Sequence, residues 1–508
     1  ARAGRGNVAN PIGLYCIAIG YMAMQTPVGN SNIAIGYQAM RDTDAGSNSD
    51  ASQNNIAIGY QSMGGTWADA QSNYNVAIGD YTMDSALDGA SYNTVIGNNA
   101  GSALTTGDQN VMLGAGAGYS ITTGQYNTLL GVDAANGHND VNNLVVIGWN
   151  AAKTIEADGT IAIGYEAMKV HTTGVNNTVI GYGAMNDTDA GGNAKDSQDN
   201  VFIGYQAGAG TWGNTGASNY NVGVGSNVLD GGLNGANSNT AMGYQALTNL
   251  TTGDENVAIG IYAGYTMAAT SDCVLVGRNA GYNINNTDAD GTVAIGYKAG
   301  EAITSGQYNT IIGYQAGDAM QTSDQNTIIG YNAGTSLVTT GAQGSTLIGM
   351  QAGEDLTSGA YNTAMGRGAL RTMTTGAGNI AIGDQAMQYV PASTAVNYVI
   401  GIGYAALNDA PNLSTAANES IAIGFGAGTN ASNLAAEFVL IGSLAGRKYN
   451  GVGSTIIGYN AGQYASGSYN TFVGSQAGEG GTTSAPYSTG INNTAIGYQA
   501  LDAFTTGP

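Results

Sequence analysis

The chain has 508 residues, of which 82 are Gly, while 43% are hydrophobic and only 9% are charged. This composition excludes a disordered chain, which would combine low hydrophobicity with many charges and prolines. The net charge of −22 would repel a phosphate backbone, so we expect no nucleic-acid partner. No apolar stretch approaches the roughly 18 residues of a membrane span, so we expect no membrane insertion of this chain.

A short apolar unit that ends in Gly recurs along the whole chain. Taken in chain order, its Gly is Gly20, Gly36, Gly59 and so on to Gly474 and Gly497, which gives 27 copies spaced 16 to 23 residues apart. One such unit cannot bury its own apolar face and must stack on its neighbours. We therefore predict that residues 1–508 form one continuous all-β domain, a parallel β-solenoid of about 27 short coils.

The three residues before each Gly predict a short strand. The first is β-branched and the third is aliphatic or Met, as in Thr310 and Ile312, and we expect this pair to form the buried face. The middle residue, such as Ile311, is apolar or Gly in every copy, so the opposite face also needs a cover. We expect another layer or another copy of the chain to supply it. An Asp at Ile311 or Ile328 should then disrupt assembly, and an Asp at Ile312 or Ile329 should unfold the coil.

Three further positions recur in register. Asn stands four residues before the Gly in 17 copies, as at Asn309, and predicts a ladder of stacked amides. Turns such as Thr105-Thr106-Gly107 precede it, where Gly can supply a positive φ at a corner. Tyr follows the Gly in 13 copies, as at Tyr314. Stacking from coil to coil is the favoured interpretation of this Tyr column, and a sugar-binding surface is the alternative.

Long loops interrupt the shorter repeats. The segment that begins at Asn186 echoes the one that begins at Arg41, 145 residues earlier, which indicates a duplicated block of eight coils, about 36–180 and 181–329. Insertions in solenoids map to loops that often carry recognition. The candidate recognition loops are 41–54, 64–73, 186–199, 208–219 and 478–492. The candidate recognition residues in them are Trp67, Trp212, Asp42, Asp44, Asp187 and Asp189.

No pattern in the chain predicts catalysis. His138 and His171 lack metal partners at ligand spacing, and the GAGAG sequence at 114–118 lacks the spacing of a dinucleotide-binding loop and is interpreted as a repeat corner. Acidic pairs such as Asp288 and Asp290 resemble calcium-loop fragments, but the distal Glu is missing. We expect neither an enzyme nor a cofactor or metal site. Cys16 and Cys273 lie 14 coils apart, about 65 Å, which excludes a disulfide between them within one chain.

The units NIAIGYQAM at Asn32 and NTAIGYQAL at Asn493 resemble the head repeats of trimeric autotransporter adhesins. The form TTGDENVAIG at Thr251 also resembles repeat arrays of phage tail fibre proteins. The resemblance implies a left-handed β-roll, three chains of which pack side by side as a homotrimer. Repeat spacing is longer here than in adhesin heads, and no heptad stalk, anchor barrel or chaperone domain is recognisable. From the lack of an initiator Met we expect a processed or excerpted chain, and the sequence stops in mid-repeat at FTTGP.

These features predict a structural and adhesive extracellular fibre on a virion or cell surface, with a phage tail fibre as the leading form. A bacterial surface adhesin, an end-to-end extracellular filament and a β-helical polysaccharide depolymerase are the alternatives. The expected partners are further copies of the chain and a cell-surface glycan or protein receptor.

Overall fold

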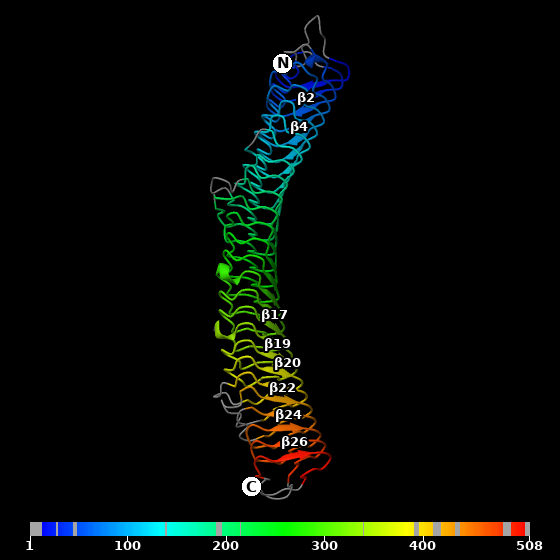
Figure 1. The fold of residues 1–508 in the computed structure, drawn as a ribbon. Coiled ribbons are helices and arrows are strands. Elements are labelled where there is room, and N and C mark those ends of the chain that lie inside the picture. Colours follow the sequence, from blue (N-terminus) through cyan, green and yellow to red (C-terminus); the bar gives the residue numbers. More distant parts are fainter. Residues whose placement is uncertain are drawn as a thin grey trace. The chain divides into compact units, whose positions relative to one another are not determined.

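The chain folds as a parallel β-solenoid built from three-residue strands (Figure 1). The computed structural model describes residues 13–26, 29–43, 48–137, 140–188, 196–213, 215–338, 340–390, 396–409, 418–431, 437–480 and 489–502. These residues contain 27 strands, each formed by the three residues before a repeat Gly, so the predicted strand positions are confirmed. They also contain the short 3-10 helices η1 (Ser49–Ala51), η3 (Thr287–Ala289) and η4 (Thr340–Ala342).

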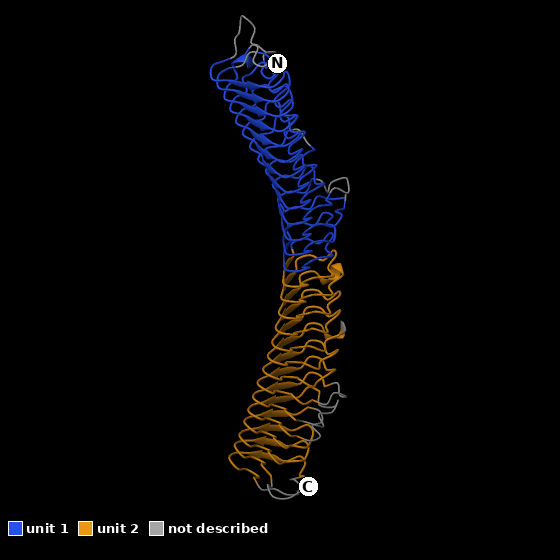
Figure 2. Cartoon of the chain, turned by 180° about the vertical axis from the view of Figure 1, so that it is seen from behind, with its two compact units in different colours: residues 1–255 blue, residues 256–508 orange. Residues whose placement is uncertain are grey.

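Figure 2 shows the two compact units of the chain, residues 1–255 and 256–508. In the first unit, each strand pairs in parallel with the next along the chain, with equivalent residues in register, as in Ile33 opposite Ile56. Its strands are β1 (Ile17–Ile19), β2 (Ile33–Ile35), β3 (Ile56–Ile58), β4 (Val76–Ile78), β5 (Thr94–Ile96), β6 (Val111–Leu113), β7 (Thr128–Leu130), β8 (Val145–Ile147), β9 (Ile161–Ile163), β10 (Thr178–Ile180), β11 (Val201–Ile203), β12 (Val222–Val224) and β13 (Thr240–Met242).

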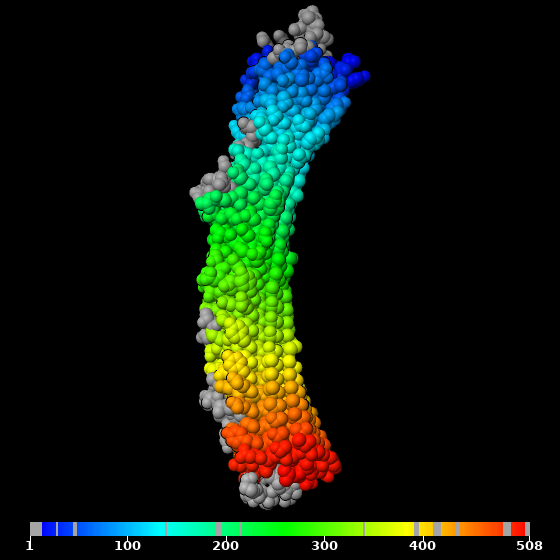
Figure 3. All heavy atoms as spheres, viewed as in Figure 1, coloured from blue at the N-terminus to red at the C-terminus, as the bar shows by residue number. Residues whose placement is uncertain are grey.

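The second unit repeats this arrangement. In Figure 3 its colours follow one another from green to red in chain order, because successive coils stack directly on one another. Its strands are β14 (Val257–Ile259), β15 (Val274–Val276), β16 (Val293–Ile295), β17 (Thr310–Ile312), β18 (Thr327–Ile329), β19 (Thr346–Ile348), β20 (Thr363–Met365), β21 (Ile380–Ile382), β22 (Ile400–Ile402), β23 (Ile421–Ile423), β24 (Val439–Ile441), β25 (Thr455–Ile457), β26 (Thr471–Val473) and β27 (Thr494–Ile496).

The core of each coil contains the middle residue of its strand. Ile311 is fully buried, whereas Thr310 and Ile312 face outward and are partly exposed. Ala316 and Ile303 of the same coil are also fully buried and complete its apolar interior. The predicted assignment of the two strand faces is therefore wrong. Side chains alternate along the strand, and the middle residue is the one that points into the coil. The apolar face that is left open to solvent is formed by the first and third strand residues, and not by the middle residue.

The repeat Gly allows the coils to stack closely. Gly313 has a φ of +142°, and a Cβ built on it would lie 2.3 Å from the carbonyl oxygen of Gly330 in the next coil. No side chain fits at that distance, since real Cβ atoms stay beyond about 3 Å of such atoms. The close approach of the two backbones explains why this position is Gly at the end of every strand.

The predicted Asn ladder is confirmed. Asn309 Nδ2 donates to the carbonyl oxygen of Ser323 at 2.8 Å, and Asn309 Oδ1 accepts from the backbone N–H of Asn326 at 2.9 Å. Both amides are buried. One side chain thus satisfies a backbone donor and a backbone acceptor of the next coil, at a corner where the strand ladder supplies no partner.

Candidate functional site

The outward face of the sheet is apolar along each unit. Its two columns are the first and third strand residues, and equivalent residues lie side by side in successive coils, as in Ile312 opposite Ile329. Several of these side chains are strongly exposed, including Leu113 at 48% and Met242 at 43%. The face is therefore a continuous strip of Ile, Val, Leu, Met and Thr rather than scattered apolar residues.

The Tyr residues that follow the repeat Gly form stacks beside this strip. The ring centroids of Tyr297 and Tyr314 lie 5.0 Å apart, and those of Tyr314 and Tyr331 lie 5.4 Å apart. In the first unit, Trp149, Tyr165, Tyr182 and Tyr205 form a similar stack. The rings of Tyr314 and Tyr331 are about half exposed. The favoured interpretation, an aromatic ladder, is confirmed, and the ladder also presents its rings to solvent.

A second Tyr column was missed in the sequence. Its members stand directly before the ladder position, in left-handed backbone such as the φ of 54° at Tyr308. That position is Asn in most of these coils, but Cys16 follows Tyr15 and Val399 follows Tyr398. The Tyr74 and Tyr92 rings stack at 5.0 Å. The exposed members are Tyr15, Tyr74, Tyr92, Tyr126, Tyr220, Tyr308, Tyr361, Tyr398 and Tyr469. The recurring Tyr-Asn dipeptide was the signal that could have revealed this column.

The two loop tryptophans lie in the core. Trp67 and Trp212 are fully buried, and each indole Nε1 donates to the backbone carbonyl four residues earlier, that of Met63 at 3.3 Å and that of Gly208 at 2.9 Å. Neither ring can contact a receptor in this position. Their burial does not support the prediction that they are recognition residues, since a large aromatic ring is stabilised by burial away from solvent.

The loop carboxylates join neighbouring coils. Thr66 Oγ1 donates to Asp42 Oδ2 at 2.9 Å, and in the duplicated block Thr211 donates to Asp187 in the same way. These acids therefore link their loops to the neighbouring coil. Asp44, Asp189 and His138 lie outside the described residues. Within the described ranges, no group of three or more His, Cys, Asp or Glu side chains is placed to hold a metal ion.

His171 is a core residue. Its Nδ1 lies 3.1 Å from Thr188 Oγ1 and its Nε2 lies 3.3 Å from Asn177 Nδ2. Burial lowers its pKa to about 4, so the ring is neutral at pH 7. The sequence HTTG at His171 corresponds to LTTG at Leu104, whose side chain is also fully buried. His171 thus occupies a position at which other coils place an aliphatic side chain.

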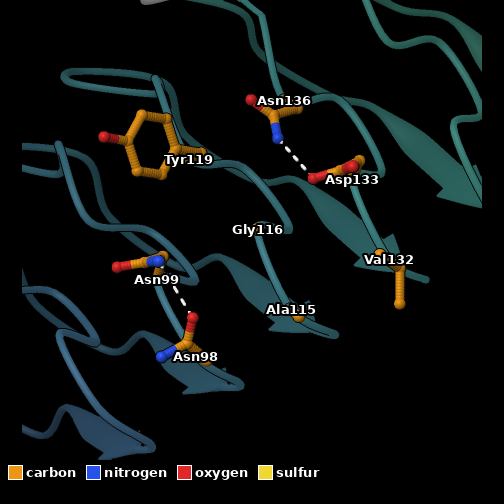
Figure 4. Close-up of a pocket in the computed structure, with 8 residues that line it drawn as sticks. All are labelled: Asn98, Asn99, Ala115, Gly116, Tyr119, Val132, Asp133 and Asn136. Atoms are coloured by element: carbon orange, nitrogen blue, oxygen red, sulfur yellow. Dashed lines mark hydrogen bonds between the residues drawn. The ribbon is translucent and has the colours of Figure 1, made fainter.

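A hollow opens where the Tyr column is interrupted (Figure 4). Three successive coils carry Asn98, Ala115 and Val132 in place of Tyr after the repeat Gly. The hollow has a volume of about 410 Å³. Its lining residues are Asn98, Asn99, Ala115, Gly116, Tyr119, Val132, Asp133 and Asn136.

Four side chains around this hollow are paired by hydrogen bonds. Asn136 Nδ2 donates to Asp133 Oδ1 at 2.6 Å, and Asn99 Nδ2 donates to Asn98 Oδ1 at 2.9 Å. The backbone beneath them continues from coil to coil, since the Gly116 N–H donates to the Asn98 carbonyl at 2.9 Å. Gly116, in the middle of the site in Figure 4, leaves room for these groups, because a Cβ there would lie 2.5 Å from Asp133 Oδ1.

Neither protein-family models nor curated proteins matched this chain. The described part of the chain has no helix with the length and apolar character that crossing a membrane requires.

Proposed function

We propose that this chain is the shaft of a structural and adhesive extracellular fibre, most specifically a phage tail fibre. The observation that carries the proposal is the apolar strip on the outward face of the sheet, which is accompanied by exposed Tyr stacks such as Tyr297, Tyr314 and Tyr331. A soluble monomer rarely exposes a contiguous apolar surface larger than a few hundred Å². The strip therefore supports a role in which the chain packs against other copies of itself.

The assembly we propose is a homotrimer of chains packed side by side. The outward pairs, such as Thr310 and Ile312, would form the contact between copies, and the acidic loops would remain on the outside. This assignment replaces the middle strand residue, which is buried within its own coil. The number three comes from the resemblance to trimeric adhesin heads. The same resemblance makes a bacterial surface adhesin the second form of the proposal.

Two other functions receive less support. A polysaccharide depolymerase needs paired carboxylates in a groove, whereas Asp42 and Asp187 each accept a hydrogen bond from a Thr of the neighbouring coil. An end-to-end filament would depend on unpaired strand edges, whereas the apolar strip runs along the side of the coils. A side-by-side fibre uses this apolar strip as its contact surface.

The proposal can be tested with the intact chain. Fluorescently labelled protein is incubated with a panel of bacterial cells and counted by flow cytometry, with an equally acidic globular protein as the control. We expect attachment to a subset of the panel and discrete rods in negative-stain electron microscopy. A compact single particle that attaches to no cell would contradict the proposal. Release of reducing ends from surface polysaccharide would instead favour the depolymerase.

A further inference from the structure

We propose that the hollow around Gly116 binds one pyranose residue of a neutral glycan. This inference rests on the proposed adhesive function and assigns a site and a ligand class to it.

The hollow arises from a local departure from the repeat. Coil six reads GAGAG at 114–118, whereas a typical coil reads GYQAG, as at 313–317. Ala115 and Gly116 thus replace an aromatic ring and a long amide side chain. Because the preceding coil has Asn98 and the following coil has Val132 in the Tyr position, the neighbouring rings do not fill the space.

The lining combines the two chemistries that a sugar ring requires. A pyranose has an apolar face of C–H groups and a rim of hydroxyls that both donate and accept hydrogen bonds. Tyr119, which is 44% exposed, and Val132 supply apolar surface at the hollow. Asn98, Asn136 and Asp133 supply amide and carboxylate groups that can pair with adjacent hydroxyls. Binding sites typically show this mixture of apolar wall and few polar groups.

The polar groups are oriented before a ligand arrives. The 2.6 Å bond from Asn136 to Asp133 and the 2.9 Å bond from Asn99 to Asn98 restrict all four side chains. The backbone N–H of Asp133 also donates to the Ala115 carbonyl at 2.9 Å, which fixes one coil on the next. A ligand therefore pays little of the ordering entropy that flexible side chains would impose.

The charge of the residues that line the hollow favours a neutral sugar over an acidic one. Of the residues that the structure places around the hollow, none is basic, and Asp133 is the one acid. The chain as a whole carries a net charge of −22. Sialic acids, uronic acids and phosphorylated ligands would meet repulsion and no cationic partner. The volume of about 410 Å³ lies at the lower end of the range for small-molecule sites, as expected for one sugar ring rather than a long oligosaccharide.

A shallow site for one sugar ring binds its ligand weakly. Assembly of several chains into one fibre would compensate for this low affinity. If several chains present the site on one fibre, the effective concentration raises the overall avidity by orders of magnitude without a new contact. Attachment of the fibre would then be strong even though a free monosaccharide binds weakly.

The test is a glycan array and an NMR titration with free monosaccharides, performed on the intact chain. The decisive variant is Ala115→Tyr with Gly116→Gln, which gives coil six the GYQAG sequence of coil 17. Gln is compatible with the left-handed backbone at this position, because Gln315 occupies the equivalent position in coil 17 at a φ of 50°. The matched control is Gly183→Gln, which makes the same change in coil ten, where a Cβ meets only ordinary contacts at 3.4 Å or more.

We expect the wild type and Gly183→Gln to bind the same neutral glycans. The double variant should lose at least tenfold in affinity while it keeps the circular dichroism spectrum of the folded solenoid, since the Asp133 carboxylate can turn away from the new side chain. Tyr119→Ala, at an exposed ring, should lose binding to a similar extent. Undiminished glycan binding by the double variant, or binding of acidic glycans alone, would overturn the proposed site. If the double variant loses monosaccharide binding but still attaches to cells, the result would support the site and place the main receptor contact elsewhere on the chain. Cell attachment without any neutral glycan binding by the wild type would overturn the site and leave the adhesive function standing.

Discussion

Ile311 and Ile312 are adjacent in strand β17, yet Ile311 is fully buried inside the coil while Ile312 lies on the outward apolar strip. The same division holds for Ile328 and Ile329 in β18, so the two columns can be changed separately.

Ile311→Asp should unfold its coil, because it places an unpaired charge in the core. We expect a loss of at least about 4 kcal/mol of local stability, visible as proteolysis near residue 311 and a lower melting temperature. Ile312→Asp combined with Ile329→Asp should leave the coil folded and raise the concentration for half-dissociation of the assembly at least tenfold. Equal effects of the two changes on melting would contradict the assignment of the faces.

Gly313→Ala should be far more damaging than Gly317→Ala. At Gly313 a Cβ would lie 2.3 Å from a backbone carbonyl oxygen that cannot move away. Gly317 has a φ of 53°, and Ala135 occupies the equivalent position in coil seven at a φ of 48°. We expect a cost of about 1 kcal/mol at Gly317, mainly from the left-handed backbone, and several times more at Gly313. Thermal melts followed by circular dichroism would measure the difference, and similar costs at the two sites would count against close stacking at Gly313.

His171→Leu should reduce the sensitivity of the fold to acid. An unfolded His titrates near 6.5, whereas burial lowers the pKa of His171 to about 4. Between these values the unfolded chain binds more protons, so the stability present above pH 6.5 is lost as the pH falls towards 4. The loss is about 3 kcal/mol, and the Leu variant, which restores the LTTG motif, should not show it. Denaturant titrations at pH 7 and pH 4 test this, and parallel stability profiles of the two proteins would contradict it.

Cys273 should resist thiol reagents in the folded protein. Its side chain is fully buried, and burial raises its pKa to about 12, so the reactive thiolate is scarce at neutral pH. Cys16 is partly exposed and should react first. In a Cys16→Ser variant we expect labelling only after denaturant is added. Rapid labelling of that variant under native conditions would show that the coil around Cys273 opens.

The strand positions could be predicted from the sequence, but the buried face could not. Alternation shows which residues share a face, and both faces of this strand are apolar, so periodicity alone does not decide between them. The range of sizes at the middle position was the available signal. Ala or Gly occurs there in many coils, as at Ala34, Gly223 and Gly401, whereas the first and third strand residues are never that small. Loop length likewise pointed to Trp67 and Trp212 without indicating that their rings fill the core.

The hollow was beyond prediction for a different reason. GAGAG at 114–118 was identified and interpreted as a corner, which it is. The hollow at this corner depends on three successive coils. It forms only because the coils on either side also carry a residue other than Tyr after the repeat Gly, namely Asn98 and Val132. Residues 17 apart in the sequence become neighbours only when the coils stack, so a single repeat does not reveal the site.

The mass of the particle in solution tests the central claim, side-by-side packing through the outward apolar strip, most directly. Sedimentation velocity of the intact chain should give a particle of three times 51.0 kDa, about 153 kDa, with a frictional ratio typical of an elongated shape. A stable, well-folded monomer of 51.0 kDa at micromolar concentration would contradict the proposal.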